Sequence, residues 1–86
     1  MYWRAAKARI LASRGFRDEA ARLSSEIVDL APRDPGFDEA FVLVQIAQFL
    51  EPEATRSTLE QALEAAESKG NLVIAARARE QLAALP

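Results

Sequence analysis

The segment FRDEAARLSSEIVDL, residues 16–30, decides the fold class. Its apolar side chains recur at intervals of four, three, four and three residues, which places them on one face of an α-helix. These side chains are Phe16, Ala20, Leu23, Ile27 and Leu30. Asp18 and Glu19 fall in the first turn, where negative charge is favourable to the helix dipole. We therefore predict a helix over residues 17–31, stopped by Pro32, with Phe16 as part of its buried face.

Four further helices are expected on either side of this segment. Alanine, the best helix former, supplies 18 of the 86 residues. Gly15 and Gly70 suit the left-handed residue that ends a helix, and Asn71 can cap the helix that follows it. The expected helices cover residues 2–14, 17–31, 35–50, 52–69 and 72–85. Because short connections make neighbouring helices antiparallel, the predicted fold is an all-α, five-helix antiparallel array.

The third of these segments has a competing interpretation. The run FVLVQI, residues 41–46, is nearly continuous in apolar side chains, which also fits a buried strand. We favour a helix, because Asp34 and Pro35 supply a cap and a first helical position and a lone strand would have no partner. Its polar residues form one narrow stripe of Asp38, Gln45 and Gln48. A helix this apolar packs on several sides, and its surplus surface predicts a homodimer through a second copy of the chain.

The chain also contains an internal repeat. A shift of 34 residues brings six identical residues into register, four of them at the start of the second and fourth predicted helices. The residues Glu19, Ala20, Arg22 and Glu26 match Glu53, Ala54, Arg56 and Glu60. A period of 34 residues is that of the tetratricopeptide helix–turn–helix unit.

Residues 1–35 resemble one tetratricopeptide repeat. The resemblance lies in Ala8 and Leu11 of the first helix, Gly15 at the turn, Asp18-Glu19-Ala20 at the start of the second helix and Pro32 at its end. It implies a single domain over residues 1–86, with a first unit at 1–35, a second at 36–70 and a capping helix at 71–86. In such arrays the first helix of each unit lines a concave surface. The resemblance therefore implies groove residues at Tyr2, Arg9, Glu39 and Leu43, for which a core or cap role is the alternative.

A narrower resemblance concerns large bacterial signalling regulators. The residues Trp3-Arg4, the turn Asp18-Glu19-Ala20 and the run KGNLVIAARAR, residues 69–79, are similar to the last helical repeats of those proteins. They join a cyclase or DNA-binding domain to an ATPase module and a long helical array. The resemblance implies that the chain is a C-terminal fragment, or a free-standing relative, of such an array.

The composition argues against catalysis and against a metal or cofactor. The chain has no cysteine and no histidine, so the commonest nucleophile, general base and zinc ligands are missing. Its three glycines are isolated and form no phosphate-binding loop. No apolar run reaches the roughly 18 residues of a membrane span. We therefore expect a non-enzymatic, soluble, cytoplasmic protein that uses no cofactor and no membrane.

Charge is distributed unevenly along the chain. Residues 1–17 carry five positive charges and no negative one, whereas residues 18–67 carry three positive and twelve negative charges. The first helix is therefore basic although the net charge is −2. Three interpretations stay open: neutralisation by acidic faces of the second and fourth helices, docking of an acidic protein or peptide, and nucleic-acid binding helped by Tyr2 and Trp3. The net charge disfavours nucleic acid.

The predicted function is accordingly that of a protein–protein interaction module. It binds a protein or peptide partner, or associates with itself, by shape and charge. The charged residues expected to orient an acidic partner are Arg4, Lys7 and Arg9. Two alternatives accompany this prediction: the helical sensor region of a bacterial regulator, and a nucleic-acid-associated helical protein.

Overall fold

The computed structural model describes residues 2–30 and 39–85 and confirms an all-α fold. Five α-helices and one short 3-10 turn make up the described chain, with no strand among these residues. The elements are α1 (Tyr2–Ser13), α2 (Arg17–Leu30), α3 (Glu39–Ile46), η2 (Ala47–Phe49), α4 (Pro52–Ser68) and α5 (Leu72–Ala84). The predicted cap at Asp34 and Pro35 and the predicted stop at Pro32 lie outside the described residues.

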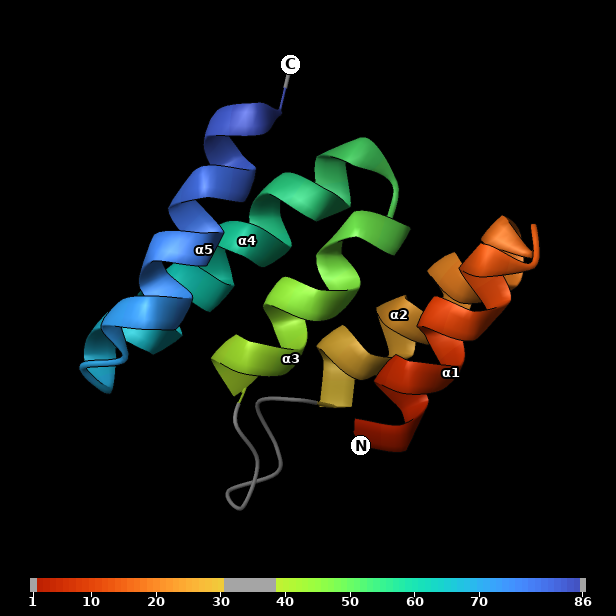
Figure 1. The fold of residues 1–86 in the computed structure, drawn as a ribbon, viewed down its shortest axis with the longest axis horizontal. Helices are drawn as coiled ribbons and strands as arrows, with labels where there is room; N and C mark the ends of the chain where they lie inside the picture. Colours follow the sequence, from red (N-terminus) through yellow and green to blue (C-terminus); the bar gives the residue numbers. More distant parts are fainter. Residues whose placement is uncertain (1, 31–38, 86) are drawn as a thin grey trace.

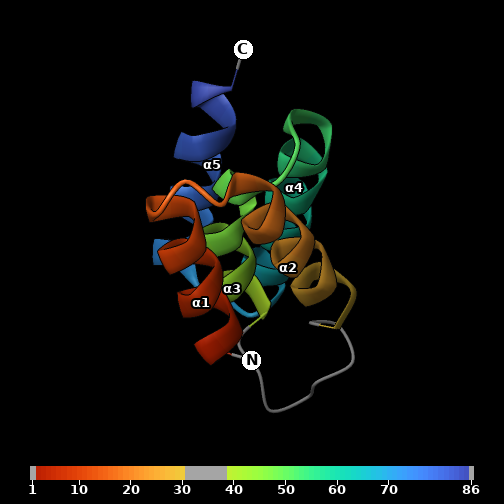
Figure 2. The same cartoon turned by 90° about the vertical axis from the view of Figure 1, so that its right-hand side faces the viewer.

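The run at residues 41–46 is helical, and α3 takes the central place in the molecule. Helices α1 and α2 pack together on one side of α3, and α4 and α5 pack together on the other (Figure 1). Seen from the side, α1 and α5 lie on one face of the molecule and α2 and α4 on the opposite face, with α3 between them (Figure 2). The division into units 1–35, 36–70 and 71–86 stays a prediction from the sequence.

The core is centred on α3. Five of the eight residues of this helix are buried, because α1, α2, α4 and α5 all contact it. The buried residues are Ala40, Val42, Leu43, Val44 and Ile46. Of the predicted polar stripe, Gln45 and Gln48 are exposed, and Asp38 lies outside the described residues. The expectation of a surplus apolar surface on this helix is therefore wrong, since the other four helices already cover it.

Two glycines end helices in the predicted way. Gly15 and Gly70 have φ values of +88° and +72°, a left-handed conformation that costs other residues free energy. At the end of α1 the Phe16 N–H donates to the Leu11 carbonyl at 2.9 Å, and the Gly15 N–H donates to the Ala12 carbonyl at 3.1 Å. This pair of hydrogen bonds defines a Schellman motif. The same pattern follows α4, so both hairpins are closed by the same backbone device.

The turn between η2 and α4 has no glycine and is closed by a side chain instead. The Thr55 hydroxyl lies 2.8 Å from the Ala47 carbonyl oxygen and donates to it from within the core. The Thr55 N–H donates to the Glu51 carbonyl at 2.8 Å and opens α4. Thr55 is 8% exposed and therefore belongs to the core. Because its side chain is polar, the pattern of apolar residues in the sequence did not reveal this position as buried.

The burial of two further residues, Phe16 and Ser24, differs from what their residue types and positions in the sequence predict. Phe16 was predicted in the core but is 52% exposed, because it precedes the first residue of α2 and lies beyond the helices that would cover it. Ser24 of α2 is fully buried, and its hydroxyl has no hydrogen-bond partner in the described chain. Ser24 thus differs from Thr55, whose buried hydroxyl is satisfied.

Candidate partner-binding surface

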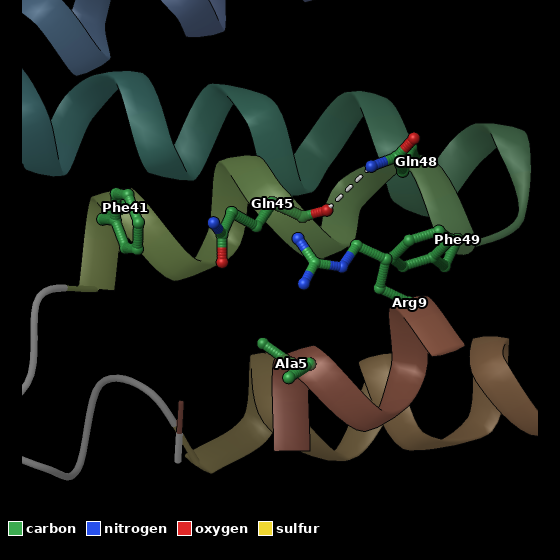
Figure 3. A pocket seen from close by; sticks show the side chains of 7 residues that line it. Ala5, Arg9, Phe41, Gln45, Gln48 and Phe49 are labelled. Carbon is green, nitrogen blue, oxygen red and sulfur yellow. Dashed lines mark hydrogen bonds between the residues drawn. The ribbon is translucent and has the colours of Figure 1, made fainter. Parts of the chain in front are cut away.

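A groove of about 290 Å³ runs between α1 and α3. Two alanines and Arg9 line its α1 side, and aromatic rings from α3 and η2 line the opposite side. Its lining residues are Ala5, Ala6, Arg9, Phe41, Gln45, Gln48 and Phe49. We call this feature the α1–α3 groove. Figure 3 shows Ala5 and Arg9 on the α1 side of the groove and Phe41, Gln45, Gln48 and Phe49 on the opposite side.

Arg9 supplies the charge of the α1–α3 groove. Its side chain extends from α1 toward α3 and lies between Gln45 and Phe49 (Figure 3). Within the described residues the Arg9 guanidinium makes no ion pair, and it is exposed. The Gln48 side-chain amide donates to the Gln45 carbonyl at 3.2 Å. The groove therefore offers a free cation, an ordered amide and two aromatic rings to a ligand.

The other cations of the first helix point elsewhere. The Arg4 guanidinium lies over the Trp3 ring, 5.6 Å from its centroid, which is the geometry of a cation–π contact. Lys7 lines a separate hollow of about 160 Å³ together with Glu19 and Glu26 of α2. No ion pair joins an α1 cation to a carboxylate in the described parts of the chain, although the carboxylates of α2 are near Lys7.

Of the six predicted binding residues, Arg9 lines the α1–α3 groove, whereas Glu39 and Leu43, like Arg4 and Lys7, do not. Leu43 is 0% exposed within the core, so its prediction as a groove residue is wrong. The cause is that α4 and α5 cover the side of α3 that the repeat resemblance had assigned to an open surface. Glu39 is half-buried, and its carboxylate accepts a hydrogen bond from the Gln61 side-chain amide of α4 at 3.3 Å. Tyr2 begins α1, but its side chain lies outside what the structure describes.

The aromatic and amide residues of the groove were not predicted as binding residues. Gln45 and Gln48 were recognised as a polar stripe on a largely apolar helix, and that contrast was the available signal. Phe41 and Phe49 were predicted as core, and each is half-buried and packs against the core while also lining the groove.

A second hollow, of about 510 Å³, lies between the η2–α4 turn and the C-terminal part of α5. Its lining is Gln48, Leu50, Pro52, Thr55, Leu59, Gln81, Ala84 and Leu85. None of these residues is charged, and the Thr55 hydroxyl is already used within the fold. This hollow therefore presents little that could orient a ligand.

The described residues contain no group of three or more acidic, histidine or cysteine side chains placed to hold a metal ion. None of the helices in that part of the chain is long and apolar enough to span a bilayer. No protein-family model, no curated protein and no solved structure matches this chain.

Proposed function

We propose that the chain is a non-enzymatic interaction module of the helical-repeat type that binds an acidic segment of a protein partner in the α1–α3 groove. The observation that carries this proposal is the Arg9 guanidinium, which is exposed in the groove between Gln45 and Phe49 and has no carboxylate partner among the described residues. A cation held in this way favours a carboxylate from outside the chain.

Each part of the groove has a role in the proposal. Arg9 binds a side-chain or terminal carboxylate of the partner through charge-assisted hydrogen bonds. Phe41 and Phe49 pack against apolar atoms of the same segment, which supplies affinity that does not depend on salt. The Gln45 side chain, which makes no hydrogen bond within the described residues, can pair with the backbone of an extended peptide. The positive charge of residues 1–17 steers acidic partners toward this face.

The test uses two peptides of equal length, one containing alternating Glu and Leu and the other with Gln in place of Glu. Binding is followed by chemical-shift changes in the ¹⁵N-labelled chain. We expect the acidic peptide to perturb Ala6, Gln45 and Phe49, and R9Q to weaken its binding about tenfold. R17Q is the matched control, because Arg17 is an exposed cation of the same basic segment but does not line the groove.

Three results would contradict the proposal. One is equal binding of the two peptides, which would remove the role of charge. Another is an equal loss of affinity in R9Q and R17Q, which would indicate general electrostatic attraction instead of a site. The third is preferential binding of a single-stranded oligonucleotide with a steep salt dependence, which would favour the nucleic-acid alternative.

A further inference from the structure

The outward side of α1 carries a second feature that the α1–α3 groove does not include. Trp3, Lys7, Ile10 and Arg14 follow one another at intervals of four, three and four residues and are all exposed. We call them the α1 ridge. Trp3 is 64% and Ile10 48% exposed, while Ala5 and Ala8 on the other side of the same helix are buried. Two large apolar side chains thus lie in solvent, about 10 Å apart along the helix axis.

The α1 ridge lies at the outer edge of the array. Helices α2 and α3 contact α1, and no other α-helix of the described chain packs extensively against it (Figure 1). Next to the ridge, the Arg4 guanidinium over the Trp3 ring restrains the indole, which therefore forms a preorganised apolar contact.

Charge argues against a second copy of the chain bound ridge to ridge. A two-fold contact between two α1 ridges would bring Lys7 and Arg14 of one copy against the same cations of the other. Residues 1–17 contain no carboxylate, and the nearby carboxylates Glu19 and Glu26 of α2 share a hollow with Lys7 but not with Arg14. Like charges brought together in this way disfavour the contact.

The acidic helices of a second copy do not complement the ridge either. Helices α2 and α4 carry most of the exposed carboxylates, but none of the exposed large apolar side chains of the described chain lies on them. Those side chains are Trp3, Ile10, Phe16, Leu72 and Val73. A contact with α2 or α4 would satisfy Lys7 and Arg14 but leave Trp3 and Ile10 against polar atoms. Helix α5 carries two of the exposed large apolar side chains, but with them it exposes Arg77 and Arg79 against the single carboxylate of Glu80, so it repeats the positive charge of the ridge.

We propose that the α1 ridge binds an amphipathic helix of a different protein, which has apolar residues on its contact face and Asp or Glu beside them. The partner helix packs along α1 in the way that α3 packs on its other side, and so extends the array by one layer. The apolar residues of the partner cover Trp3 and Ile10, and its carboxylates pair with Lys7 and Arg14. This surface is separate from the α1–α3 groove and does not depend on the function proposed for it.

Trp3 is the only tryptophan of the chain, so its fluorescence reports directly on this surface. The probe is a helical peptide of about 18 residues without tryptophan, with Leu at heptad spacing flanked by Glu. We expect a blue shift of Trp3 emission on binding. I10A should weaken binding about tenfold, and K7E/R14E should abolish it, while R9Q leaves it unchanged. A matching peptide with Lys in place of Glu should cause no shift.

The controls separate this proposal from its competitors. A Trp3 shift that appears on concentrating the chain alone, together with dimerisation by light scattering, would overturn it in favour of self-association. A shift with vesicles of phosphatidylserine and phosphatidylcholine but not with the acidic peptide would assign the ridge to a lipid surface. An unshifted spectrum with saturating acidic peptide, or equal responses to the two peptides, would refute it.

Discussion

Ser24 allows a direct test of whether the core contains a buried hydroxyl without a hydrogen-bond partner. Its hydroxyl is fully buried on α2 and has no hydrogen-bond partner among the described residues. A buried polar group without a partner costs about 1–3 kcal/mol, because the hydroxyl loses water without replacing it. S24A removes this cost and adds about 0.5 kcal/mol of helix propensity. The void left by the oxygen opposes the gain by a few tenths of a kcal/mol. We therefore expect S24A to stabilise the protein by about 1–3 kcal/mol.

The next residue provides a matched control. Ser25 lies on the same helix and is exposed, so S25A changes helix propensity by the same amount without changing a buried hydroxyl. Its expected gain is about 0.5 kcal/mol. The free energy of unfolding of both variants is measured by urea unfolding, followed by circular dichroism. In thermal unfolding of a chain of this size, each kcal/mol corresponds to about 4–8 °C in Tm. If S24A is no more stable than S25A, the hydroxyl is satisfied in solution and the reasoning is refuted.

The remaining predictions concern the core and its closing contacts. L43A should destabilise the protein by about 2–5 kcal/mol, measured by urea unfolding, because Leu43 is 0% exposed. A smaller loss of unfolding free energy in L43A than in I10A would contradict the burial of Leu43. T55V keeps the shape of the side chain and should cost about 1 kcal/mol by removing the hydrogen bond to Ala47, so an unchanged Tm would contradict the role of that hydroxyl. N71A should cost about 1 kcal/mol, since the Asn71 side chain accepts from the Ile74 N–H at 3.2 Å, whereas N71D should retain most of the stability if the cap is correctly described.

Much of the fold follows from local signals in the sequence. The glycines at 15 and 70 and the proline at 52 mark helix ends to within one or two residues, because each acts through its own backbone dihedral angles. The helix over 41–46 was also predicted correctly. What the sequence could not specify was which helices cover it, since that depends on packing angles that no local pattern encodes. The predicted surplus surface on α3 failed for this reason.

The candidate site was less predictable than the fold. Of the residues expected to bind, Arg9 lines the α1–α3 groove, whereas Leu43 is core and Glu39 contacts α4. Charge along the chain identified the basic helix correctly but could not assign its cations to different sides of that helix. Thr55 escaped notice because a hydroxyl that bonds to a carbonyl eight residues earlier leaves no periodic signature.

The central position of α3 also orders the protein's local opening. Among the described residues this helix is the shortest of the five, yet five of its eight residues are buried and four helices contact it, whereas α1 and α5 border solvent on their outer sides. Opening α3 requires separating most of the remaining elements first, so its amide protons should exchange with deuterium through global unfolding alone, while those of the outer helices exchange by fraying. A partner that binds α1 of the folded chain alone therefore slows exchange in α1 and, by raising the free energy of global unfolding, also slows exchange at the centre.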